Sequence, residues 1–313
     1  MNWKSGKEFL DRCFDVRVTG DVPYAMGVIN WSTSPTRRTL TLDIYEPVGA
    51  PSQPRPALIM AFGGAFHRGS KESDNFPDEG HFNTTVAEYC HKFASRGYMA
   101  FCIDYRKVQE DPDPGTIPLV TNPSSIPTNR INVVRNMLSL PPVTTEIMCA
   151  GYEAACDDLG NAITFVRNNA EQYGVDTSRI AIGGFSAGGF LSLSVAYGAR
   201  MPVSAVVSLS GYMTLDDLER YVTGDIDTTG LPPILLVSGE HDLEEIGEQA
   251  PIMGDHFSRA GLLHAQHIIP GENHFYSADV MITTSDGNSM TLETIISEFL
   301  NERMNLGSAS SQP

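Results

Sequence analysis

The segment Gly184-Phe185-Ser186-Ala187-Gly188 contains the residue types that nucleophilic catalysis by a serine requires. An apolar stretch that begins at Arg179 precedes it, and small residues from Ala187 to Ala199 follow it. A strand that turns sharply into a helix leaves no room for a Cβ atom near the turn, so glycine is needed on both sides of the serine. The pattern predicts Ser186 as a nucleophile at the carboxyl edge of a sheet, with the N–H of Ala187 available to an oxyanion.

A serine becomes a strong nucleophile only when a base takes its proton and a third group orients that base. In this strand–turn–helix arrangement, the acid and then the histidine follow the serine along the chain. Asp242 lies at the end of the apolar strand that starts at Ile234 and is the expected acid, with Glu240 as the alternative. His274 lies in a polar turn after the last predicted strand and is the expected base. The other histidines show no metal-binding pattern, so neither a metal nor another cofactor is expected.

A second group of oxyanion donors is predicted directly after the apolar strand Ala57 to Phe62. The small residues Gly63, Gly64 and Ala65 let the backbone pass close to a substrate, so the N–H groups of Gly64 and Ala65 could bind its carbonyl oxygen. The alternative is a glycine-rich turn that provides flexibility alone. Aromatic residues beside the catalytic loops are candidates for substrate binding, although such residues more often belong to the core. They are Phe66, Tyr105, Phe185, Tyr212 and Phe275.

Predicted strands and helices alternate along most of the chain, which is typical of a parallel sheet covered by helices. Leu40, Leu42 and Ile44 alternate with polar residues, as expected of a half-buried strand. Further strands are expected at Gly27–Ser32, Tyr98–Tyr105, Ser204–Ser210, Pro233–Ser238 and Ala265–Ile269. Helices are expected at residues 5–14, Thr84–Arg96, Tyr152–Tyr173, Glu248–Ala260 and Leu292–Leu300.

Residues 107–150 interrupt this alternation with seven prolines and no strong period. A loop of that length is rarely without function in a compact fold. We interpret it as a cap or substrate-loop insertion over the site, with a short helix near Asn129 to Leu138; the alternative is a surface excursion far from the chemistry. Residues 1–306 are expected to form a single domain, and residues 307–313 a disordered tail.

The composition limits the classes of function. The chain has 313 residues and a formal net charge of −17, which argues against nucleic acid and anionic membrane surfaces as partners. A small-molecule substrate is expected, and a homodimer is compatible with the sequence. The N-terminus has no apolar signal region and no long apolar run occurs, which favours a cytoplasmic protein; a processed exported protein would look the same.

The five cysteines are odd in number and include no C-x-x-C motif. Neither a disulfide framework nor a zinc site is therefore expected, although a pair among Cys102, Cys149 and Cys156 is an alternative.

Taken together, these motifs resemble the α/β-hydrolase superfamily. The closest branch contains carboxylesterases, feruloyl-esterase-like enzymes and kynurenine-formamidase-like enzymes. The resemblance extends from Leu40 to Leu300 and implies a mostly parallel central sheet with helices on both faces. The matching segments are Asp43-Ile-Tyr-Glu-Pro47, Phe62-Gly-Gly-Ala-Phe66, Arg96-Gly-Tyr98, Asp104-Tyr-Arg106, Gly184-Phe-Ser-Ala-Gly-Gly189, Gly239-Glu-His-Asp242 and Gly271-Glu-Asn-His274.

Three positions depart from the pattern of the superfamily. Phe62 stands where a histidine is usual, and Ala65 replaces a glycine. Phe185 precedes the nucleophile where hormone-sensitive-lipase-like enzymes usually have aspartate, so the resemblance to that branch is weaker.

The expected function is serine-dependent hydrolysis of carboxylic esters through an acyl-enzyme. The nearest alternative is an amidase or formamidase, which needs the same three catalytic residues. An acyltransferase and a non-catalytic binding protein on the same fold are further alternatives.

Overall fold

The computed structural model describes residues 8–76, 82–126, 128–222, 228–284 and 287–306 of the chain. Within them, eight strands form one sheet in the order β1-β2-β4-β3-β5-β6-β7-β8. The β1–β2 and β2–β4 pairs are antiparallel, and all other neighbours are parallel. The strands are β1 (Asp15–Ile29), β2 (Thr36–Val48), β3 (Arg55–Ala61), β4 (Met99–Ile103), β5 (Val175–Phe185), β6 (Ala205–Leu209), β7 (Ile234–His241) and β8 (His264–Asn273).

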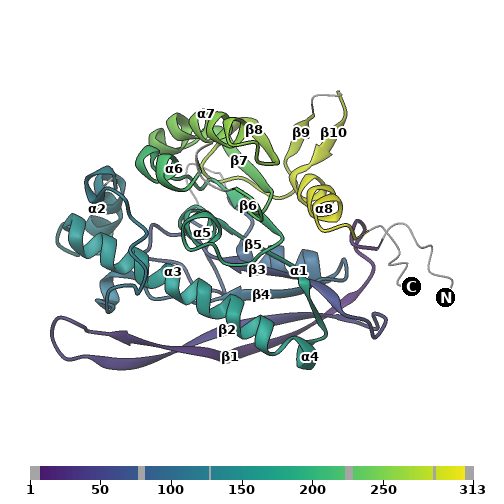
Figure 1. Cartoon of the computed structure of the whole chain (residues 1–313), viewed down its shortest axis with the longest axis horizontal. Helices are drawn as coiled ribbons and strands as arrows, with labels where there is room; N and C mark the ends of the chain where they lie inside the picture. Colours follow the sequence, from purple (N-terminus) through teal and green to yellow (C-terminus); the bar gives the residue numbers. More distant parts are fainter. Residues whose placement is uncertain (1–7, 77–81, 127, 223–227, 285–286, 307–313) are drawn as a thin grey trace.

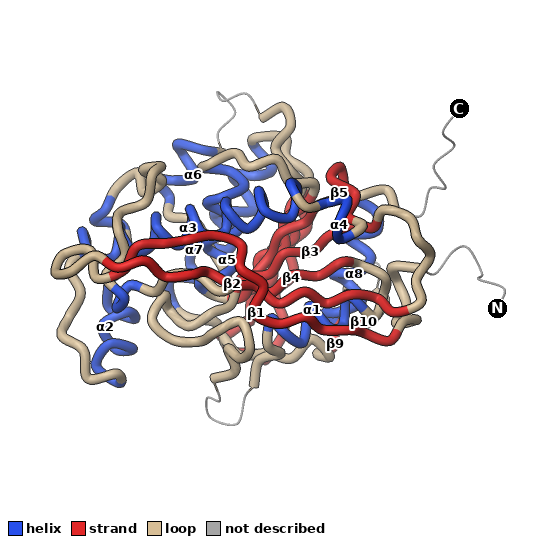
Figure 2. The backbone as a smooth tube through the Cα atoms, turned by 90° about the horizontal axis from the view of Figure 1, so that it is seen from below, coloured by secondary structure: helices blue, strands red, loops and turns tan. Residues whose placement is uncertain are grey.

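The middle of the sheet forms the core of the protein. Every residue of β3, β4 and β6 is buried, as expected for strands that are apolar on both faces. At the edge, β1 and β2 form a long antiparallel ribbon that extends past the other strands towards α2 (Thr128–Met137) (Figure 2). Leu40, Leu42 and Ile44 of β2 are buried, as predicted. The prediction of a half-buried strand is wrong here, because Asp43 and Tyr45 between and after them are buried as well.

Helices cover both faces of the sheet (Figure 1). Along the sheet, the crossover from β3 to β4 runs towards β1. The crossovers from β4 to β5, from β5 to β6 and from β7 to β8 run towards β8. Because such crossovers are right-handed, the first helix and the helices of the later crossovers lie on opposite faces. The helices besides α2 include α1 (Val86–Ala94), α3 (Thr145–Asn168), α5 (Ala187–Leu193), α7 (Glu244–Arg259) and α8 (Leu292–Arg303).

Helix α8 packs beside α1. The Lys92 ammonium of α1 lies 3.0 Å from a carboxylate oxygen of Glu293 in α8, and Arg12 and Arg96 also contact this carboxylate. The remaining elements are short: α4 (Ala170–Tyr173), α6 (Leu215–Tyr221), the 3₁₀ turns Val108–Glu110 and Pro123–Ser125, a π-turn at Ser194–Gly198, and the hairpin of β9 (Met281–Thr283) and β10 (Ser289–Thr291). In the described chain, no helix has the length and apolar character needed to cross a membrane.

The prediction of an N-terminal helix is wrong for residues 8–14; residues 5–7 lie outside the described residues. The backbone N–H of Phe9 donates to the carbonyl of Arg96, and the N–H groups of Cys13 and Phe14 donate to that of Ser95. These bonds tie the segment to the end of α1, so it forms turns instead of a helix. Of the extended segment predicted at Gly27–Ser32, the first three residues are the end of β1, which starts at Asp15, and the last three form a turn.

Two helices begin earlier than predicted. Helix α3 begins at Thr145, where the Thr144 hydroxyl accepts a hydrogen bond from the N–H of Ile147. Helix α7 begins at Glu244. The helix predicted near Asn129–Leu138 corresponds to α2, whereas α6 and the β9–β10 hairpin were not predicted. The tail at residues 307–313 lies outside the described residues.

Candidate active site

Ser186 occupies a strained turn between β5 and α5. Its backbone has φ 53° and ψ −116°, and its N–H donates to the carbonyl of Leu209 on β6 at 2.7 Å. A Cβ atom at Gly188 would lie 1.9 Å from the carbonyl oxygen of Ala61, and one at Gly184 would lie 2.3 Å from the carbonyl carbon of Gly188. Both glycines are therefore required by close packing, as the sequence argument predicted.

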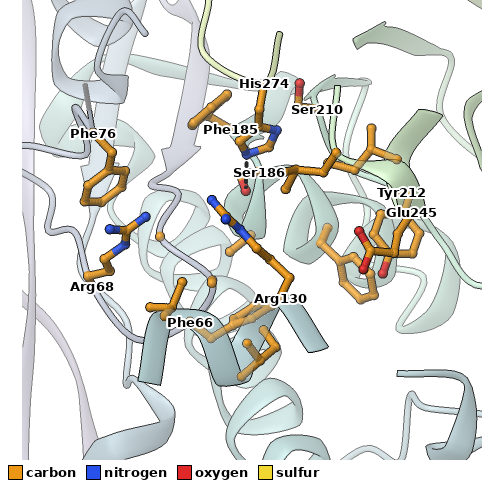
Figure 3. Close-up of a pocket in the computed structure, with 18 of the residues that line it drawn as sticks. Phe66, Arg68, Phe76, Arg130, Phe185, Ser186, Ser210, Tyr212, Glu245 and His274 are labelled. Atoms are coloured by element: carbon orange, nitrogen blue, oxygen red, sulfur yellow. Dashed lines mark hydrogen bonds between the residues drawn. The ribbon is translucent and has the colours of Figure 1, made fainter. Parts of the chain in front are cut away.

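His274 and Asp242 lie in line with this serine. The Nε2 atom of His274 is 3.0 Å from Ser186 Oγ (Figure 3). Its Nδ1 atom is 2.6 Å from Asp242 Oδ1. Since the carboxylate accepts from Nδ1–H, Nε2 is left to accept the serine proton. The three side chains come from the ends of β5, β7 and β8, which meet at the carboxyl edge of the sheet. The structure thus brings the three predicted residues into hydrogen-bond contact. Glu240, the alternative acid, instead accepts from the N–H of Gly271.

Asp242 has a full set of hydrogen-bond donors and no exposed side-chain surface. The N–H groups of Gly239 and Leu243 donate to its two oxygens at 3.1 and 2.8 Å. The Ser210 hydroxyl donates to Oδ2 at 2.6 Å and lies 2.9 Å from the Tyr276 hydroxyl. These donors fix the carboxylate in one orientation.

Ser210 and Tyr276 were not identified from the sequence. Ser210 follows β6 directly, so its position at the carboxyl end of a predicted strand was the available signal.

The loop after β3 runs along the edge of the cavity beside Ser186. Gly64, Ala65 and Phe66 all have positive φ angles, of 126°, 55° and 60°. This turn directs the backbone of Gly64 and Ala65 into the cavity, which Ala187 also lines. In the described part of the chain, the N–H groups of Gly64, Ala65 and Ala187 have no hydrogen-bond acceptor. They are free to bind an oxygen atom of a ligand.

Two buried side chains hold this loop in place. Asp74 is fully buried and accepts from the N–H of Gly63 at 2.9 Å and from that of Val86 at 3.0 Å. Burial raises the pKa of Asp74 to about 6. On the other side, His67 Nδ1 lies 2.7 Å from the Ala65 carbonyl, and its Nε2 lies 2.8 Å from the Arg135 guanidinium. Arg135 only donates, so Nδ1 carries the proton and donates to the loop. Burial lowers the pKa of this imidazole.

Four of the five predicted aromatic residues line the cavity, and Tyr105 does not. Phe185 lies 5.1 Å and Phe275 lies 5.0 Å, centroid to centroid, from the His274 ring. Phe66 and Tyr212 line the cavity farther from the triad. Tyr105 is instead fully buried; its ring stacks on Phe62 at 4.1 Å, and its hydroxyl donates to the Phe62 carbonyl. The prediction for Tyr105 is therefore wrong, because its ring packs on Phe62 in the core and does not reach the cavity.

The remaining wall of the cavity comes mostly from the segment interpreted as an insertion. Residues between positions 107 and 150 contribute Ile126, Arg130, Ile131, Val134 and Met148. Phe190 and Tyr152 extend the aromatic lining, with ring centroids 4.9 Å apart. Three charged residues that the sequence did not single out, Arg68, Arg130 and Glu245, also line the cavity (Figure 3).

The described residues contain no cluster of three histidine, cysteine or acidic side chains that could hold a metal ion. All five cysteines are free thiols, so the alternative of a pair among Cys102, Cys149 and Cys156 does not hold.

Comparison with known proteins adds to this geometry. The family model described as BD-FAE matches residues 146–206, which include most of α3 and the whole turn that carries Ser186. No curated protein matches the chain.

Several solved structures share the fold. The thermophilic esterase Est2 from the Planctomycetes species Thermogutta terrifontis, with propionate bound, is 18% identical, with coverage of 88% of this chain and 93% of that chain and a TM-score of 0.56. Thermogutta terrifontis esterase 2 phosphorylated by paraoxon is 18% identical, with 83% and 84% covered and a TM-score of 0.53. A truncated carbohydrate esterase from gut microbiota is 18% identical, with 94% and 98% covered and a TM-score of 0.54.

These findings confirm the fold that the sequence predicted. The chain has an α/β-hydrolase fold, with a mostly parallel eight-stranded sheet and helices on both faces. The resemblance to this superfamily is thus borne out at the level of the fold, and the family model matches the segment around Ser186, residues 146–206.

Proposed function

We propose that the protein is a serine hydrolase that cleaves carboxylic esters through an acyl-enzyme intermediate. The observation that carries the proposal is the continuous line from Ser186 Oγ through His274 to Asp242, with hydrogen-bond distances of 3.0 and 2.6 Å at the floor of an open cavity. A serine, a histidine and a buried carboxylate in this geometry are suited to acyl transfer. The esterases among the similar structures support the same chemistry.

In the proposed mechanism, Ser186 Oγ attacks the ester carbonyl carbon while His274 Nε2 takes its proton. The resulting imidazolium is stabilised by the Asp242 carboxylate, which its backbone and hydroxyl donors hold in place. His274 then gives the proton to the departing alcohol, which leaves the acyl group on Ser186. A water molecule, deprotonated by His274, releases the acid and restores the serine.

Negative charge on the carbonyl oxygen would be stabilised by the N–H groups of Gly64, Ala65 and Ala187. They are supplied by two separate loops and line the same cavity as Ser186. Donors that are already oriented before the reaction typically contribute about 3 kcal/mol each to the transition state.

The test is hydrolysis of p-nitrophenyl acetate, butyrate and octanoate by the wild type, Ser186→Ala and Ser208→Ala. Ser208 is a matched control, because it is a serine near the end of β6, beside the strand that carries Ser186, and its buried hydroxyl has no partner among the described residues. We expect the wild type and Ser208→Ala to turn over these esters, and Ser186→Ala to lose at least ~10⁴-fold in kcat. Turnover of p-nitroanilides but not of the matched esters would instead support an amidase. Equal turnover by Ser186→Ala would refute the proposal.

A further inference from the structure

Two arginines face the cavity from separate segments of the chain. Arg68 follows the Gly63–Ala65 loop, and its backbone N–H donates to the Gly64 carbonyl at 3.1 Å. Arg130 lies on α2 and reaches across the cavity towards Ser186 (Figure 3). The fold therefore places two positive charges on the wall opposite the triad.

Neither charge has a protein partner within the described chain. No ion pair or side-chain hydrogen bond is formed by Arg68 or Arg130, and the Nε atom of Arg68 is buried without an acceptor. In contrast, the buried guanidinium groups of Arg55, Arg96 and Arg106 are all paired with carboxylates. This difference matters because a buried donor without a partner typically costs ~1–3 kcal/mol.

The position of Arg68 leaves its hydrogen-bonding edge available. Its Cζ atom lies 4.2 Å from the centroid of the Phe76 ring, so the ring covers one face of the guanidinium group. The N–H groups lie in the guanidinium plane, where a carboxylate can accept two of them. The ring contact therefore orients the side chain without satisfying its donors.

The two arginines also repel one another. Burial and the charge of Arg130 both lower the pKa of Arg68. The chain as a whole is acidic, with a formal net charge of −17, so it contains many carboxylates that could have paired with these arginines. The carboxylate that lines the cavity, Glu245, lies on its other side, next to Tyr212 (Figure 3). An arrangement that costs stability without serving the fold is typical of a ligand site.

We propose that Arg68 and Arg130 form a carboxylate subsite, so that the preferred substrate is an ester that carries a carboxylate group. The inference rests on the proposed ester hydrolysis and names the class of substrate. A carboxylate between the two guanidinium groups relieves their repulsion and accepts from N–H groups of both arginines. Glu245 repels the same group and thereby favours one orientation of the substrate in the cavity.

The experiment compares esters that differ only in this charge. On the acyl side, p-nitrophenyl hydrogen adipate is compared with p-nitrophenyl isooctanoate, in which an isopropyl group replaces the carboxylate. On the alcohol side, para-acetoxybenzoate is compared with para-isopropylphenyl acetate. For each pair, the readout is the ratio of kcat/KM for the charged ester to that for the neutral ester. The pair that gives the higher ratio identifies the arm of the ester that reaches the arginines.

We expect the wild type to prefer the charged ester by at least about tenfold in one pair, and Arg68→Gln and Arg130→Gln each to lower that ratio about tenfold. Arg130→Lys keeps the charge and is expected to restore part of the preference. Arg259→Gln is the matched control: it also removes one positive charge, but from the exposed far end of α7. Its ratio should equal that of the wild type.

The outcomes separate this inference from the proposed function. If all four esters are hydrolysed in a Ser186-dependent way and both arginine variants keep the wild-type ratios, the carboxylate subsite is overturned and the esterase proposal stands. Hydrolysis of none of the four esters would count against the esterase proposal, and the subsite would fall with it. A loss of ratio in Arg130→Gln alone would overturn the role given to Arg68.

Discussion

The cavity has two walls that differ in whether their polar side chains have hydrogen-bond partners within the described protein. The triad wall is lined by Ser186, His274 and Ser210, with Asp242 buried behind them. Each of these side chains has a protein partner within hydrogen-bond distance. On the arginine wall, formed by Arg68, Arg130 and apolar residues of α2, the charged groups have none among the described residues. The first wall is complete before a substrate arrives, whereas the second is completed by the substrate.

The difference follows from what each wall has to do. Acyl transfer requires a fixed geometry, and hydrogen bonds from rigid strand ends provide it. Substrate recognition requires donors that are still unsatisfied in the free protein, because only these gain from binding. Substitutions on the two walls should therefore have different effects on rate and stability.

The largest effect is expected from Asp242→Asn on the triad wall. The amide cannot accept from His274 Nδ1–H and two backbone N–H groups as a carboxylate does, so the imidazole would adopt the wrong tautomer or orientation. We expect kcat for p-nitrophenyl butyrate to fall by ~10³–10⁴-fold. The matched variant Glu240→Gln, at a residue that accepts from the N–H of Gly271, should alter kcat less than about threefold. A larger fall in kcat for the Glu240 variant than for the Asp242 variant would show that Glu240, not Asp242, is the acid.

Asp74→Asn tests the environment of the buried carboxyl group that accepts from the N–H of Gly63. The pKa of Asp74 is raised from its ordinary value of 3.8 to about 6, so the folded protein binds a proton that the unfolded chain releases between these values. The free energy of unfolding therefore falls as the pH rises through this window, and is constant with respect to this group above it. The variant lacks this titration. Its stability relative to the wild type should improve by about 3 kcal/mol between pH 3.5 and pH 7, which corresponds to about two pKa units.

Urea denaturation of both proteins across this pH range measures the difference. A gap between the two proteins that does not change with pH would show that Asp74 keeps its ordinary pKa, and that burial does not dominate its environment.

Ser210→Ala removes the side-chain donor that orients Asp242. A hydrogen bond to a charged group contributes ~1.5–3 kcal/mol, so we expect kcat to fall at least about tenfold with a smaller change in KM. The pH profile of kcat should also shift, because the carboxylate would stabilise the imidazolium to a different degree. Ser208→Ala removes a hydroxyl of similar burial without a partner and should do neither. Equal losses in the two variants would mean that Ser210 only supports packing.

The smallest effect is expected on the arginine wall, and it is a gain in the stability of the fold. Arg130→Gln removes one of two neighbouring like charges, so it should stabilise the fold by about 0.5 kcal/mol in thermal denaturation. Arg135, on the same helix, donates to His67 Nε2 and to the Pro141 carbonyl. Arg135→Gln should therefore destabilise the fold by about 1 kcal/mol. Destabilisation by Arg130→Gln of similar size would show that Arg130 has a partner within the protein.

The triad wall could be predicted from the sequence because its chemistry depends on local patterns. The two glycines around Ser186 are required by backbone contacts within one turn, and strand ends identify Asp242 and His274. Tyr105 was misplaced because adjacency to a strand end does not reveal on which side of the backbone a ring lies. Ser210 was missed although it follows a strand end, because only the folded chain shows that its hydroxyl donates to Asp242.

The arginine wall could not be predicted in the same way. Arg68 and Arg130 lie in segments without a regular period, and only the folded chain reveals that neither has a partner among the residues that the structure describes. The start of α3 did have a local signal: Thr144 precedes Glu146 in the pattern of a helix N-cap with an acidic first turn. The N-terminal turns had no such signal, because their hydrogen bonds go to the end of α1.

The central claim is that Ser186 is the nucleophile, and covalent labelling tests it most directly. Wild type, Ser186→Ala and Ser208→Ala would be treated with paraoxon and analysed by intact mass and peptide mapping. A serine nucleophile forms a bond to phosphorus as p-nitrophenolate leaves, with its proton taken up by His274. We predict one diethylphosphoryl group per chain in wild type and Ser208→Ala, on the peptide that contains Ser186, and none in Ser186→Ala. A label on another residue, or equal labelling of Ser186→Ala, would contradict the account.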